Sequence, residues 1–520
     1  MTEVLISRNP VSGKILKEHN QTPLEQIPFL ISKARVAQKQ WENTPVKERP
    51  AYFYKIKEYV LDNMDTIASL ICEENGKPKQ EAYLTEIFSV LELITVYSKR
   101  VPKILRNCPI PLYFMKNKKS YLEFWPKGVV AIISPWNFPF SIPFGEIVLA
   151  LLCGNAVLFK PSEVTPLIGL KIFEICEAVG LPKGLLQVVL GDGSRGSELI
   201  QCGVDKVFFT GSGSTGKKVM ASASQNLTPV VLELGGKDPM IILEDADLDF
   251  ASSAALWGGF VNSGQACAST ERILVQENIH DEFIQKLKEK VTQLRLGEDV
   301  GAITFEKQKS VYETHLSELT SQNSKIICGG KFSENKTFLE PTIITNPDGI
   351  ADCPIEKTKI YNEETFGPVV AVTKFKTVDE AIEKANASRY GLLASIITKD
   401  YGLGKKIVSR IQAGSVLINE VLYTHGLSET PWGGVKESGF GVVHSDLGVL
   451  EFVNTRHVHL PRSWFPVFKS LWWFPYSTHQ LLFFKGFMEV LFRSSWIAKM
   501  KALPSFLLEL MRMFFKEKRL

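Results

Sequence analysis

The chain has 520 residues, enough for two or three domains with substantial hydrophobic cores. Hydrophobic residues make up 45% and charged residues 22%, as in ordinary soluble globular proteins, which excludes an extensively disordered chain. The eight cysteines are scattered without a C-x-x-C pair, which excludes a disulfide scaffold and a zinc site with paired cysteines. The N-terminus has neither the basic nor the apolar region of a secretory signal. We therefore expect a cytoplasmic protein with no metal site and no nucleic-acid partner.

The positive charge is concentrated at the C-terminus. Residues 462–520 contain ten Lys and Arg against three Asp and Glu, so this segment carries +7 and residues 1–461 carry −3. The same segment holds 15 of the 54 aromatic residues. This change in composition predicts a separate C-terminal module.

The first 100 residues are predicted to be largely helical. Apolar residues recur at helical spacing over three segments: 27–41, 52–71 and 81–96. Gly76 and Pro78 mark the break before the third segment. Alternating residues within 112–125 then predict a hairpin arm.

Strands alternate with helices in the rest of the chain, which predicts βαβ units and mainly parallel sheets. The first α/β pattern has strands at 129–133, 156–159, 186–190 and 206–209, with a helix at 167–179. The second covers about 236–440, with helices at 280–296 and 378–387 and strands at 368–375 and 415–418. Ligands of such sheets bind beyond the carboxyl ends of the strands.

Cys267 is the candidate nucleophile. It lies in 262–270, a run of small and polar residues that leaves room for a substrate and lacks the apolar bulk that buries a structural thiol. Glu233 lies 34 positions earlier in a stretch that continues into two glycines. A thiol and a carboxylate in these settings indicate a nucleophile and its base.

The turn 211–216 competes for the same glutamate. It matches G-x-G-x-x-G, follows a predicted strand and precedes a predicted helix, as in a dinucleotide-binding fingerprint. The acid that binds ribose in that fingerprint comes about 20 residues later, close to Glu233. Glu233 cannot be both the base and the ribose ligand. The alternative to a dinucleotide-binding turn is a glycine-rich turn that binds no ligand.

Seven motifs in order resemble those of the aldehyde dehydrogenase superfamily, over about residues 10–460. They are SPWNFP at 134–139, FKPSE at 159–163, FTGS at 209–212, ELGGK at 233–237, GQAC at 264–267, EETFGP at 363–368 and PWGGVKESG at 431–439. The resemblance implies that Cys267 adds to an aldehyde to give a thiohemiacetal. Asn137 and the backbone N–H of Cys267 would form the oxyanion hole, and Glu233 would activate the water that hydrolyses the thioester.

The resemblance also implies a cofactor site that releases Glu233 from the ribose role. Lys160 and Glu163 would hold the adenosine ribose, and a carboxylate there favours NAD, although Lys160 leaves room for NADP. Lys237 and Lys436 are expected to have structural or loop-ordering roles. The remaining expected cofactor residues are Trp136, Ser162, Gly211, Ser212, Gly213, Gly216 and Leu234, with Glu364 and Phe366 at the nicotinamide end.

The expected fold is α/β, of the aldehyde dehydrogenase kind. A Rossmann-like NAD-binding domain would comprise 1–111 and 127–235, and a catalytic α/β domain 236–449. A β arm from 112–126 and 450–461 would join the chains of a homodimer or homotetramer.

Residues 462–520 depart from the family's plan. A helix is predicted over 479–501, and the longest uncharged run, 470–484, is too short and too polar for a membrane span. Either this extension lies in a membrane interface, or it covers the enzyme's own body or a partner chain.

The expected substrate is an apolar aliphatic or aromatic aldehyde. Succinate semialdehyde is the alternative, with Arg272 or a distant arginine binding its carboxylate. A CoA-acylating enzyme would not need Glu233, and a catalytically inactive scaffold would not need Cys267, Glu233 and Asn137 together.

Overall fold

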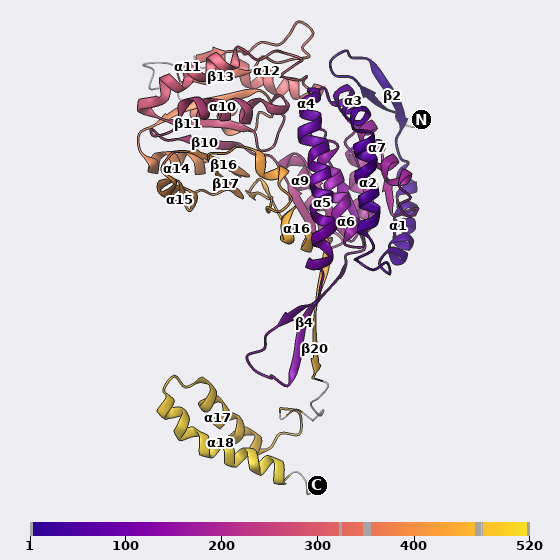
Figure 1. The fold of residues 1–520 in the computed structure, drawn as a ribbon, viewed down its shortest axis with the longest axis vertical. Helices are drawn as coiled ribbons and strands as arrows, with labels where there is room; N and C mark the ends of the chain where they lie inside the picture. The colour runs from indigo at the N-terminus through magenta and orange to yellow at the C-terminus, as the bar shows by residue number, and fades with distance from the viewer. Residues whose placement is uncertain (1–3, 322–324, 347–354, 463–469, 471, 517–520) are drawn as a thin grey trace. The chain divides into compact units, whose positions relative to one another are not determined.

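The computed structural model describes residues 4–321, 325–346, 355–462, 470 and 472–516, which fall into two compact units (Figure 1). The larger unit comprises the described residues up to 107 together with 123–456. The smaller comprises 108–122 together with the described residues from 457 onward.

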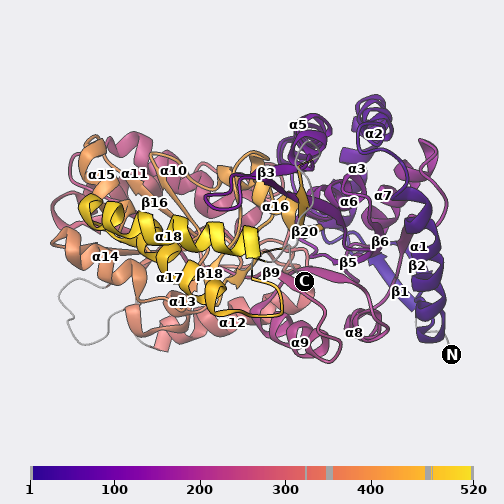
Figure 2. The ribbon, with the colours of Figure 1, turned by 90° about the horizontal axis from the view of Figure 1, so that it is seen from below.

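The first sheet of the larger unit has the strand order β19-β9-β8-β5-β6-β7, and only β19 runs antiparallel to its neighbour. In Figure 2, α6 and α7 lie on one side of β5 and β6, and α8 and α9 on the other. Because helices cover both faces, β5 and β6 are buried at every position. The strands are β5 (Val129–Ile133), β6 (Ala156–Lys160), β7 (Leu186–Val188), β8 (Lys206–Thr210), β9 (Val230–Glu233) and β19 (Gly439–Phe440). The helices are α6 (Ser141–Leu152), α7 (Pro166–Ala178), α8 (Gly193–Gln201) and α9 (Gly213–Ser224).

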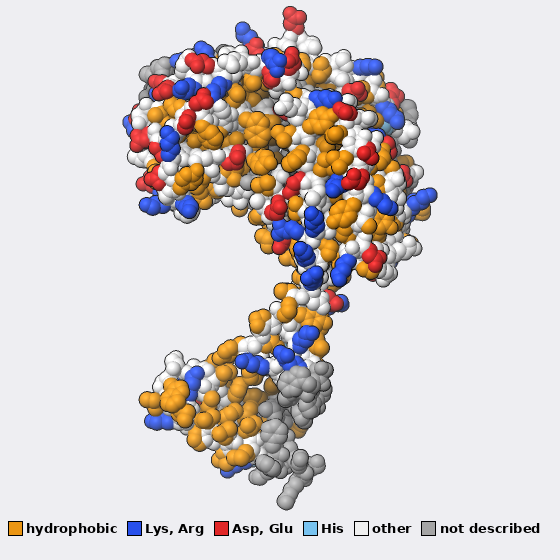
Figure 3. Space-filling view, in the orientation of Figure 1, with side chains coloured by type: hydrophobic (Ala, Val, Ile, Leu, Met, Phe, Trp, Pro, Cys, Tyr) orange, Lys and Arg blue, Asp and Glu red, His pale blue; other side chains and the backbone are white. Residues whose placement is uncertain are grey.

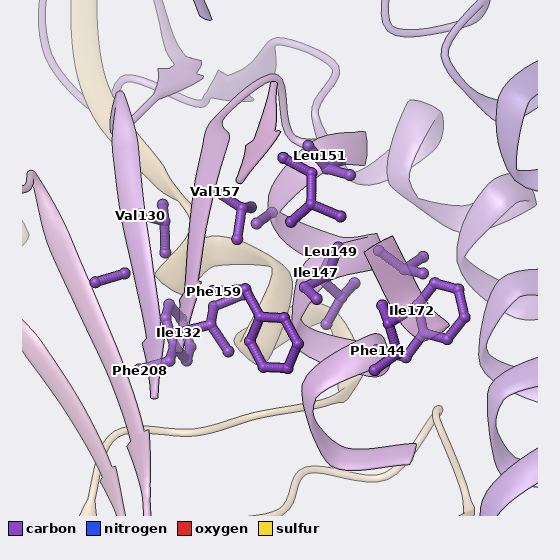
Figure 4. Packing of buried hydrophobic residues seen from close by; sticks show 14 of the residues in the cluster. Val130, Ile132, Phe144, Ile147, Leu149, Leu151, Val157, Phe159, Ile172 and Phe208 are labelled. Carbon is purple, nitrogen blue, oxygen red and sulfur yellow. The ribbon is translucent and has the colours of Figure 1, made fainter. Parts of the chain in front are cut away.

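The core of this sheet is apolar and closely packed. In Figure 4, Val157 and Phe159 of β6 lie beside Ile147 and Leu151 of α6. Every residue of α6 is buried. The helix and strands therefore form a rigid frame for the loops at the carboxyl ends of the strands.

An N-terminal hairpin and a layer of helices pack against this sheet. The segment predicted to be helical over 52–71 is helical except at Asn63, which leaves the helical conformation (φ −118°, ψ 14°) and divides it into two helices. The Asn63 Nδ2 donates to the carbonyl of Tyr59. The helix predicted over 27–41 is confirmed. The elements are β1 (Val4–Arg8), β2 (Ile15–Asn20), α1 (Ile27–Trp41), α2 (Pro50–Asp62), α3 (Met64–Asn75), α4 (Lys79–Glu81), a π-helical turn (Ala82–Ile87) and α5 (Phe88–Ile104).

The second sheet has the order β12-β13-β14-β11-β10-β16-β17, parallel except for β12. The predicted alternation of strands and helices is confirmed in both sheets. The strands are β10 (Asp238–Ile242), β11 (Thr270–Gln276), β12 (Lys325–Cys328), β13 (Thr342–Thr345), β14 (Val369–Phe375), β16 (Leu393–Ile397) and β17 (Ser415–Ile418), with a separate pair, β15 (Tyr390–Gly391) and β18 (Val435–Lys436). The helices are α10 (Leu248–Phe260), α11 (His280–Val291), α12 (Glu306–Ser321), α13 (Lys359–Asn362), α14 (Val378–Asn386) and α15 (Tyr401–Val408). The later helix α16 (Ser445–Glu451) instead packs against α5, and its Val449 belongs to the core of the first sheet.

The smaller unit combines strands with a helical hairpin. β3 (Cys108–Ile110) and β4 (Lys118–Pro126) form an antiparallel hairpin, which begins before the predicted segment 112–125, and β20 (Val453–Pro461) completes a sheet of order β20-β4-β3. The helix predicted over 479–501 is wrong. Two helices, α17 (Thr478–Phe492) and α18 (Trp496–Lys516), are separated at Arg493, whose ψ of 135° is extended.

Aromatic packing holds the two C-terminal helices together. The ring of Phe506 on α18 lies 5.2 Å from Phe483 and 5.8 Å from Phe487 on α17. Phe487 also lies 5.4 Å from Phe114 in the β3–β4 connection. Throughout the described ranges, no helix has both the length and the apolar character that crossing a bilayer requires.

Candidate active site

A cavity of about 660 Å³ lies beyond the carboxyl ends of β5, β6, β8 and β9. It brings together nearly all the site residues predicted from sequence. Gly213 and Gly216 do not line it, and a Cβ on Gly216 would lie 2.6 Å from the Leu234 side chain, so this glycine serves helix packing. The predicted residues on its wall are Trp136, Asn137, Lys160, Ser162, Glu163, Gly211, Ser212, Glu233, Leu234, Cys267, Glu364 and Phe366.

A second cavity, of about 90 Å³, reaches Cys267 from another direction. Cys267 and Ile142 line both cavities, so the thiol lies where they meet. We call the second cavity the tunnel. Its other lining residues are Leu84, Thr85, Phe88, Ser89, Phe138, Ser141, Trp257, Val261, Ala266, Ala268, Leu422, Tyr423, Gly426 and Trp432.

A buried turn holds the loop that carries Cys267. Asn262 and Ser263 adopt the left-handed conformation (φ 52° and 57°), which costs backbone energy and requires external support. Both carboxylate oxygens of Glu81 accept hydrogen bonds from the Asn262 N–H, at 3.0 and 3.1 Å. Gln265 donates to the carbonyls of Asn262 and Ala302. These bonds set the direction of the chain into Cys267.

Two glycines let the Glu233 motif approach the other loops closely. A Cβ on Gly236 would lie 2.4 Å from the Cys267 carbonyl oxygen, and a Cβ on Gly235 would lie 2.2 Å from a Glu364 carboxylate oxygen. The Gly236 N–H donates to the Glu364 Oε1 at 3.1 Å. Three predicted motifs are therefore in direct contact.

The surroundings of the Cys267 thiol favour its neutral form. Burial raises its pKa above the ordinary range, and the carboxylates of Glu364, Asp238 and Glu233 raise it further. Sulfur is nucleophilic as the thiolate, so the reaction needs a group that removes this proton.

Glu233 is held in a setting that suits a base. Its carboxylate is buried, and neither oxygen has a hydrogen-bond partner among the described residues. Burial raises its pKa well above the ordinary value, and the nearby Glu146 carboxylate raises it further. An unpartnered carboxylate on the cavity wall can accept a proton from water or from the thiol.

Glu146 is a carboxylate that sequence reasoning missed. It is the only charged residue in α6, which is otherwise apolar after Ser141, and that solitary charge is the signal that could have identified it. Burial raises its pKa to about 8, and it accepts a hydrogen bond from Thr210. Thr210 is paired in register with Glu233 across β8 and β9.

Asn137 lies in the loop after β5 and is buried. Its Nδ2 donates to the Gln265 carbonyl at 3.0 Å. An amide nitrogen carries two N–H groups, so a second donor remains for a ligand in the cavity. Asn137 is thereby tied to the loop of the candidate nucleophile.

The far part of the large cavity fits a dinucleotide. The buried Lys160 Nζ lies 3.7 Å from the half-exposed Glu163 carboxylate, so a cation and a hydrogen-bond acceptor lie together as a ribose requires. Ser212 caps α9 by accepting from the Thr215 N–H at 3.3 Å. The N-terminus of α9 offers backbone N–H groups to a pyrophosphate, and a Cβ on Gly213 would meet nothing within 4 Å.

A buried ion pair orders the loop of Glu364 and Phe366. Glu271 accepts from the Lys237 Nζ and from the backbone N–H groups of Thr365 and Phe366. Lys237 therefore has a loop-ordering position, as expected. Phe366 lies 5.4 Å from Trp136, edge to face.

Lys436 likewise bonds to backbone, donating to the carbonyls of Asn386 and Ser388.

The expectation that Arg272 could bind a substrate carboxylate is wrong. Its side chain is buried, lines neither cavity, and donates to the carbonyls of Lys237, Lys384 and Ala385. Because its N–H groups are bonded to backbone carbonyls, Arg272 links β11 to Lys237 and to α14.

Comparison with known proteins agrees with this arrangement. A Methylomonas sp protein named 4,4'-diapolycopene aldehyde oxidase is 38% identical, over 93% of this chain and 90% of its own. A Mycobacterium tuberculosis (strain ATCC 25618 / H37Rv) protein, provisionally named succinate-semialdehyde dehydrogenase (NADP(+)) 2, is 34% identical over 83% of each chain. The structure of betaine aldehyde dehydrogenase from Staphylococcus aureus, in complex with NAD+, matches with a TM-score of 0.83 and 31% identity, over 91% of this chain and 93% of that chain.

The sequence model of the Aldehyde dehydrogenase family matches residues 2–458. The structure agrees with that match. It has two sheets and a cavity at the carboxyl ends of the strands, and Cys267 lines that cavity. The chain belongs to the aldehyde dehydrogenase family and is an oxidoreductase that acts on aldehydes.

Proposed function

We propose that this enzyme oxidises an apolar aliphatic or aromatic aldehyde to its carboxylate, with NAD as the hydride acceptor. The observation that carries the proposal is the tunnel to Cys267. All of its described lining residues are uncharged, and most are aliphatic or aromatic. Burying an alkyl chain there is favourable by about 0.8 kcal/mol per methylene.

The outer part of the tunnel also favours an apolar substrate. Four of its lining residues are large, apolar and substantially exposed: Leu84 (45%), Phe88 (47%), Trp257 (37%) and Tyr423 (40%). Exposed apolar residues grouped at an opening are typical of a binding site for an apolar ligand. A semialdehyde would instead place its carboxylate among uncharged side chains, which is unfavourable without a cationic partner.

The Methylomonas relative supports the same substrate class, because its name describes oxidation of a polyene aldehyde. The C-terminal extension, 462–520, makes up more than a tenth of the chain, so an alignment over 93% of the chain includes part of it. The extension is thus shared in part with a relative named for an apolar aldehyde.

In the proposed reaction, the Cys267 Sγ attacks the aldehyde carbon after a base takes its proton. The developing oxyanion receives hydrogen bonds from the Asn137 Nδ2 and the Cys267 backbone N–H, donors worth on the order of 10²–10³ in rate each. Bound NAD supplies the hydride acceptor. Glu233 then takes a proton from a water that attacks the resulting thioester, the C–S bond breaks, and the thiol is restored as the carboxylate leaves.

Preference for NAD over NADP follows from Glu163 in this proposal. Its carboxylate accepts hydrogen bonds from a ribose 2′-hydroxyl and repels a 2′-phosphate. The adjacent Lys160 moderates that repulsion.

The proposal also assigns roles to the domains. Residues 1–111 and 127–235 bind the cofactor, and residues 236–449 supply the thiol.

The β arm provides the proposed contact between chains, in a homodimer or homotetramer through 112–126 and 450–461. Within this arm, β20 is an edge strand of the three-stranded sheet; the other edge strand, β3 (Cys108–Ile110), lies just before residue 112. Edge strands present unpaired N–H and C=O groups to a second chain.

The same proposal includes peripheral attachment of this cytoplasmic enzyme to an anionic membrane through α17 and α18. Figure 3 shows hydrophobic side chains gathered over these helices. Trp496, Phe492 and Ile497 are 72%, 70% and 66% exposed. Apolar side chains beside cationic ones favour the interface of an anionic bilayer. The other exposed apolar residues are Leu481, Leu482, Met488, Met500, Leu507, Leu508 and Met511, and the cations are Lys485, Arg493, Lys499, Lys501 and Arg512.

A series of straight-chain aldehydes, with succinate semialdehyde alongside, tests the substrate class through NADH absorbance. We expect kcat/KM to rise about fourfold per added methylene until the tunnel is filled. Phe88→Arg should reduce this dependence and raise the relative use of succinate semialdehyde. Phe29→Arg is the control, because Phe29 is 68% exposed and lines neither cavity. A preference of the unmodified enzyme for succinate semialdehyde would contradict the proposal.

A further inference from the structure

We propose that Lys77 and Glu86, a buried ion pair outside the cavity walls, are positioning residues for the oxyanion hole. The two side chains are fully buried, and the Lys77 Nζ lies 2.6 Å from the Glu86 Oε1. Neither residue lines a cavity, so neither touches a substrate. Their contacts lie on the loop between β5 and α6, which carries Asn137. The inference rests on the proposed role of Asn137.

Lys77 holds the backbone of Asn137 directly. Its Nζ donates to the Asn137 carbonyl at 3.0 Å and lies 4.3 Å from the centre of the Phe138 ring. The Asn262 Nδ2 donates to the same carbonyl at 2.9 Å. The Asn137 peptide is therefore fixed by two donors, one of them charged.

Glu86 holds the other end of the loop. Its Oε2 accepts from the backbone N–H groups of Phe140 and Ser141, at 3.1 and 2.7 Å. Ser141 is the first residue of α6, where the first N–H groups of a helix have no partner within it. One carboxylate thus joins the start of α6 to the ammonium that holds Asn137.

A third bond completes the arrangement. Asn75 lies two residues before Lys77 in the chain, and its Nδ2 donates to the Trp136 carbonyl at 2.8 Å. The segment 75–77 therefore binds the carbonyls of both peptide groups that flank the Asn137 Cα. This arrangement restrains the Asn137 side chain more than the single bond from its Nδ2 to Gln265 could.

Positioning of this kind changes the rate of the oxyanion-forming steps and leaves the sequence of bonds made and broken unchanged. A displacement of about 1 Å in a catalytic donor costs on the order of 10² in rate. A charge left without its buried partner displaces its neighbours, because it moves to find water or another acceptor. Loss of Lys77 should therefore slow the steps that form an oxyanion and leave cofactor affinity unchanged.

The test uses acyl transfer from 4-nitrophenyl acetate, which requires no cofactor. The Cys267 Sγ bonds to the acetyl carbon, 4-nitrophenolate leaves and is measured at its absorbance, and water then hydrolyses the thioester. We expect Lys77→Met to slow nitrophenolate release by 10- to 100-fold. Lys77→Met on an Asn137→Ala background should slow it no further, because the residue being positioned is gone.

Lys206→Met is the matched control. Lys206 is also buried, lies 2.5 Å from Glu451 and 5.4 Å from the Phe208 ring, and lines neither cavity. It should lower the thermal unfolding temperature without slowing nitrophenolate release. Glu86→Gln is a second, milder variant that retains an oxygen acceptor for the loop, and we expect an intermediate rate.

Two results would overturn the positioning role. In the first, Asn137→Ala slows release whereas Lys77→Met and Glu86→Gln do not. In the second, Lys77→Met slows the Asn137→Ala enzyme as much as the unmodified one, as a general loss of stability would. If Asn137→Ala itself leaves the rate unchanged, the oxyanion role in the proposed function fails, and this inference fails with it.

Discussion

The backbone at Gly236 lies directly against Cys267, so closely that a Cβ on Gly236 would be 2.4 Å from the Cys267 carbonyl oxygen. The loop that follows Glu233 and the loop that carries the thiol are therefore in contact through backbone atoms. This contact sets the position of the base relative to the nucleophile.

Gly236→Ala should separate the two loops. A methyl group in that space forces a backbone shift, which costs about 1–3 kcal/mol in the free energy of unfolding. We expect a lower unfolding temperature and at least a tenfold lower rate of NADH formation. Gly402→Ala is the control, because a Cβ there meets only the Asp400 side chain. Full activity of Gly236→Ala would show that the contact is dispensable.

Cys267→Ser should abolish aldehyde-dependent NADH formation, because a hydroxyl is a much poorer nucleophile than a thiolate. Iodoacetamide should inactivate the unmodified enzyme, and faster as the pH rises, since burial and nearby carboxylates raise the pKa of Cys267. Cys108→Ser, at an exposed thiol, should retain full activity and the same inactivation. Turnover by Cys267→Ser would contradict the covalent mechanism.

Glu146→Gln should move the acidic limb of the pH–rate profile to lower pH. Glu233 acts as a base when it is ionised, and both burial and the Glu146 carboxylate raise its pKa. Removing the Glu146 charge lowers that pKa, but burial keeps it above the ordinary value. The measurement is kcat against pH under conditions in which thioester hydrolysis limits turnover. An unchanged limb, or a shift to higher pH, would show that Glu146 does not influence the base.

Glu163→Gln should reduce the preference for NAD. Without the carboxylate, Lys160 meets a 2′-phosphate with no opposing charge, so NADP binding improves. We expect the ratio of kcat/KM for NAD to that for NADP to fall about tenfold, equivalent to about 1.4 kcal/mol. If the unmodified enzyme already prefers NADP strongly, the proposed choice of cofactor is wrong.

The full-length enzyme should sediment with liposomes that contain anionic phospholipid, and a variant truncated after Pro461 should not. Replacing Lys485, Arg493, Lys499, Lys501 and Arg512 with glutamine should weaken binding by about 1 kcal/mol per charge near the surface. Neutral liposomes provide the comparison. Equal recovery of both proteins in the soluble fraction would favour packing of the extension on the enzyme or a partner chain.

Much of this protein could be read from the order of its residues. Short apolar runs such as 129–133 and 156–159 predicted buried parallel strands, because every position of such a strand faces a covering helix. The motifs around Cys267 and Glu233 indicated the family, because each is a local pattern of glycines and polar residues. The smaller errors were also local. Asn63 and Arg493 interrupt regions of continuous helical periodicity, which apolar spacing does not reveal.

Only the tertiary structure decided which side chains support the site. In the sequence, Lys77 lies in the break between Gly76 and Pro78 and Glu86 lies in a helical segment, and both resemble ordinary surface charges, but both are fully buried against the Asn137 loop. Glu146 becomes significant because folding buries it near Glu233. Arg272 became a structural residue for the same reason, since its partners are the carbonyl of Lys237 and carbonyls of α14. The effects of burial and pairing on a charge depend on neighbours distant in the chain, and the sequence alone does not specify them.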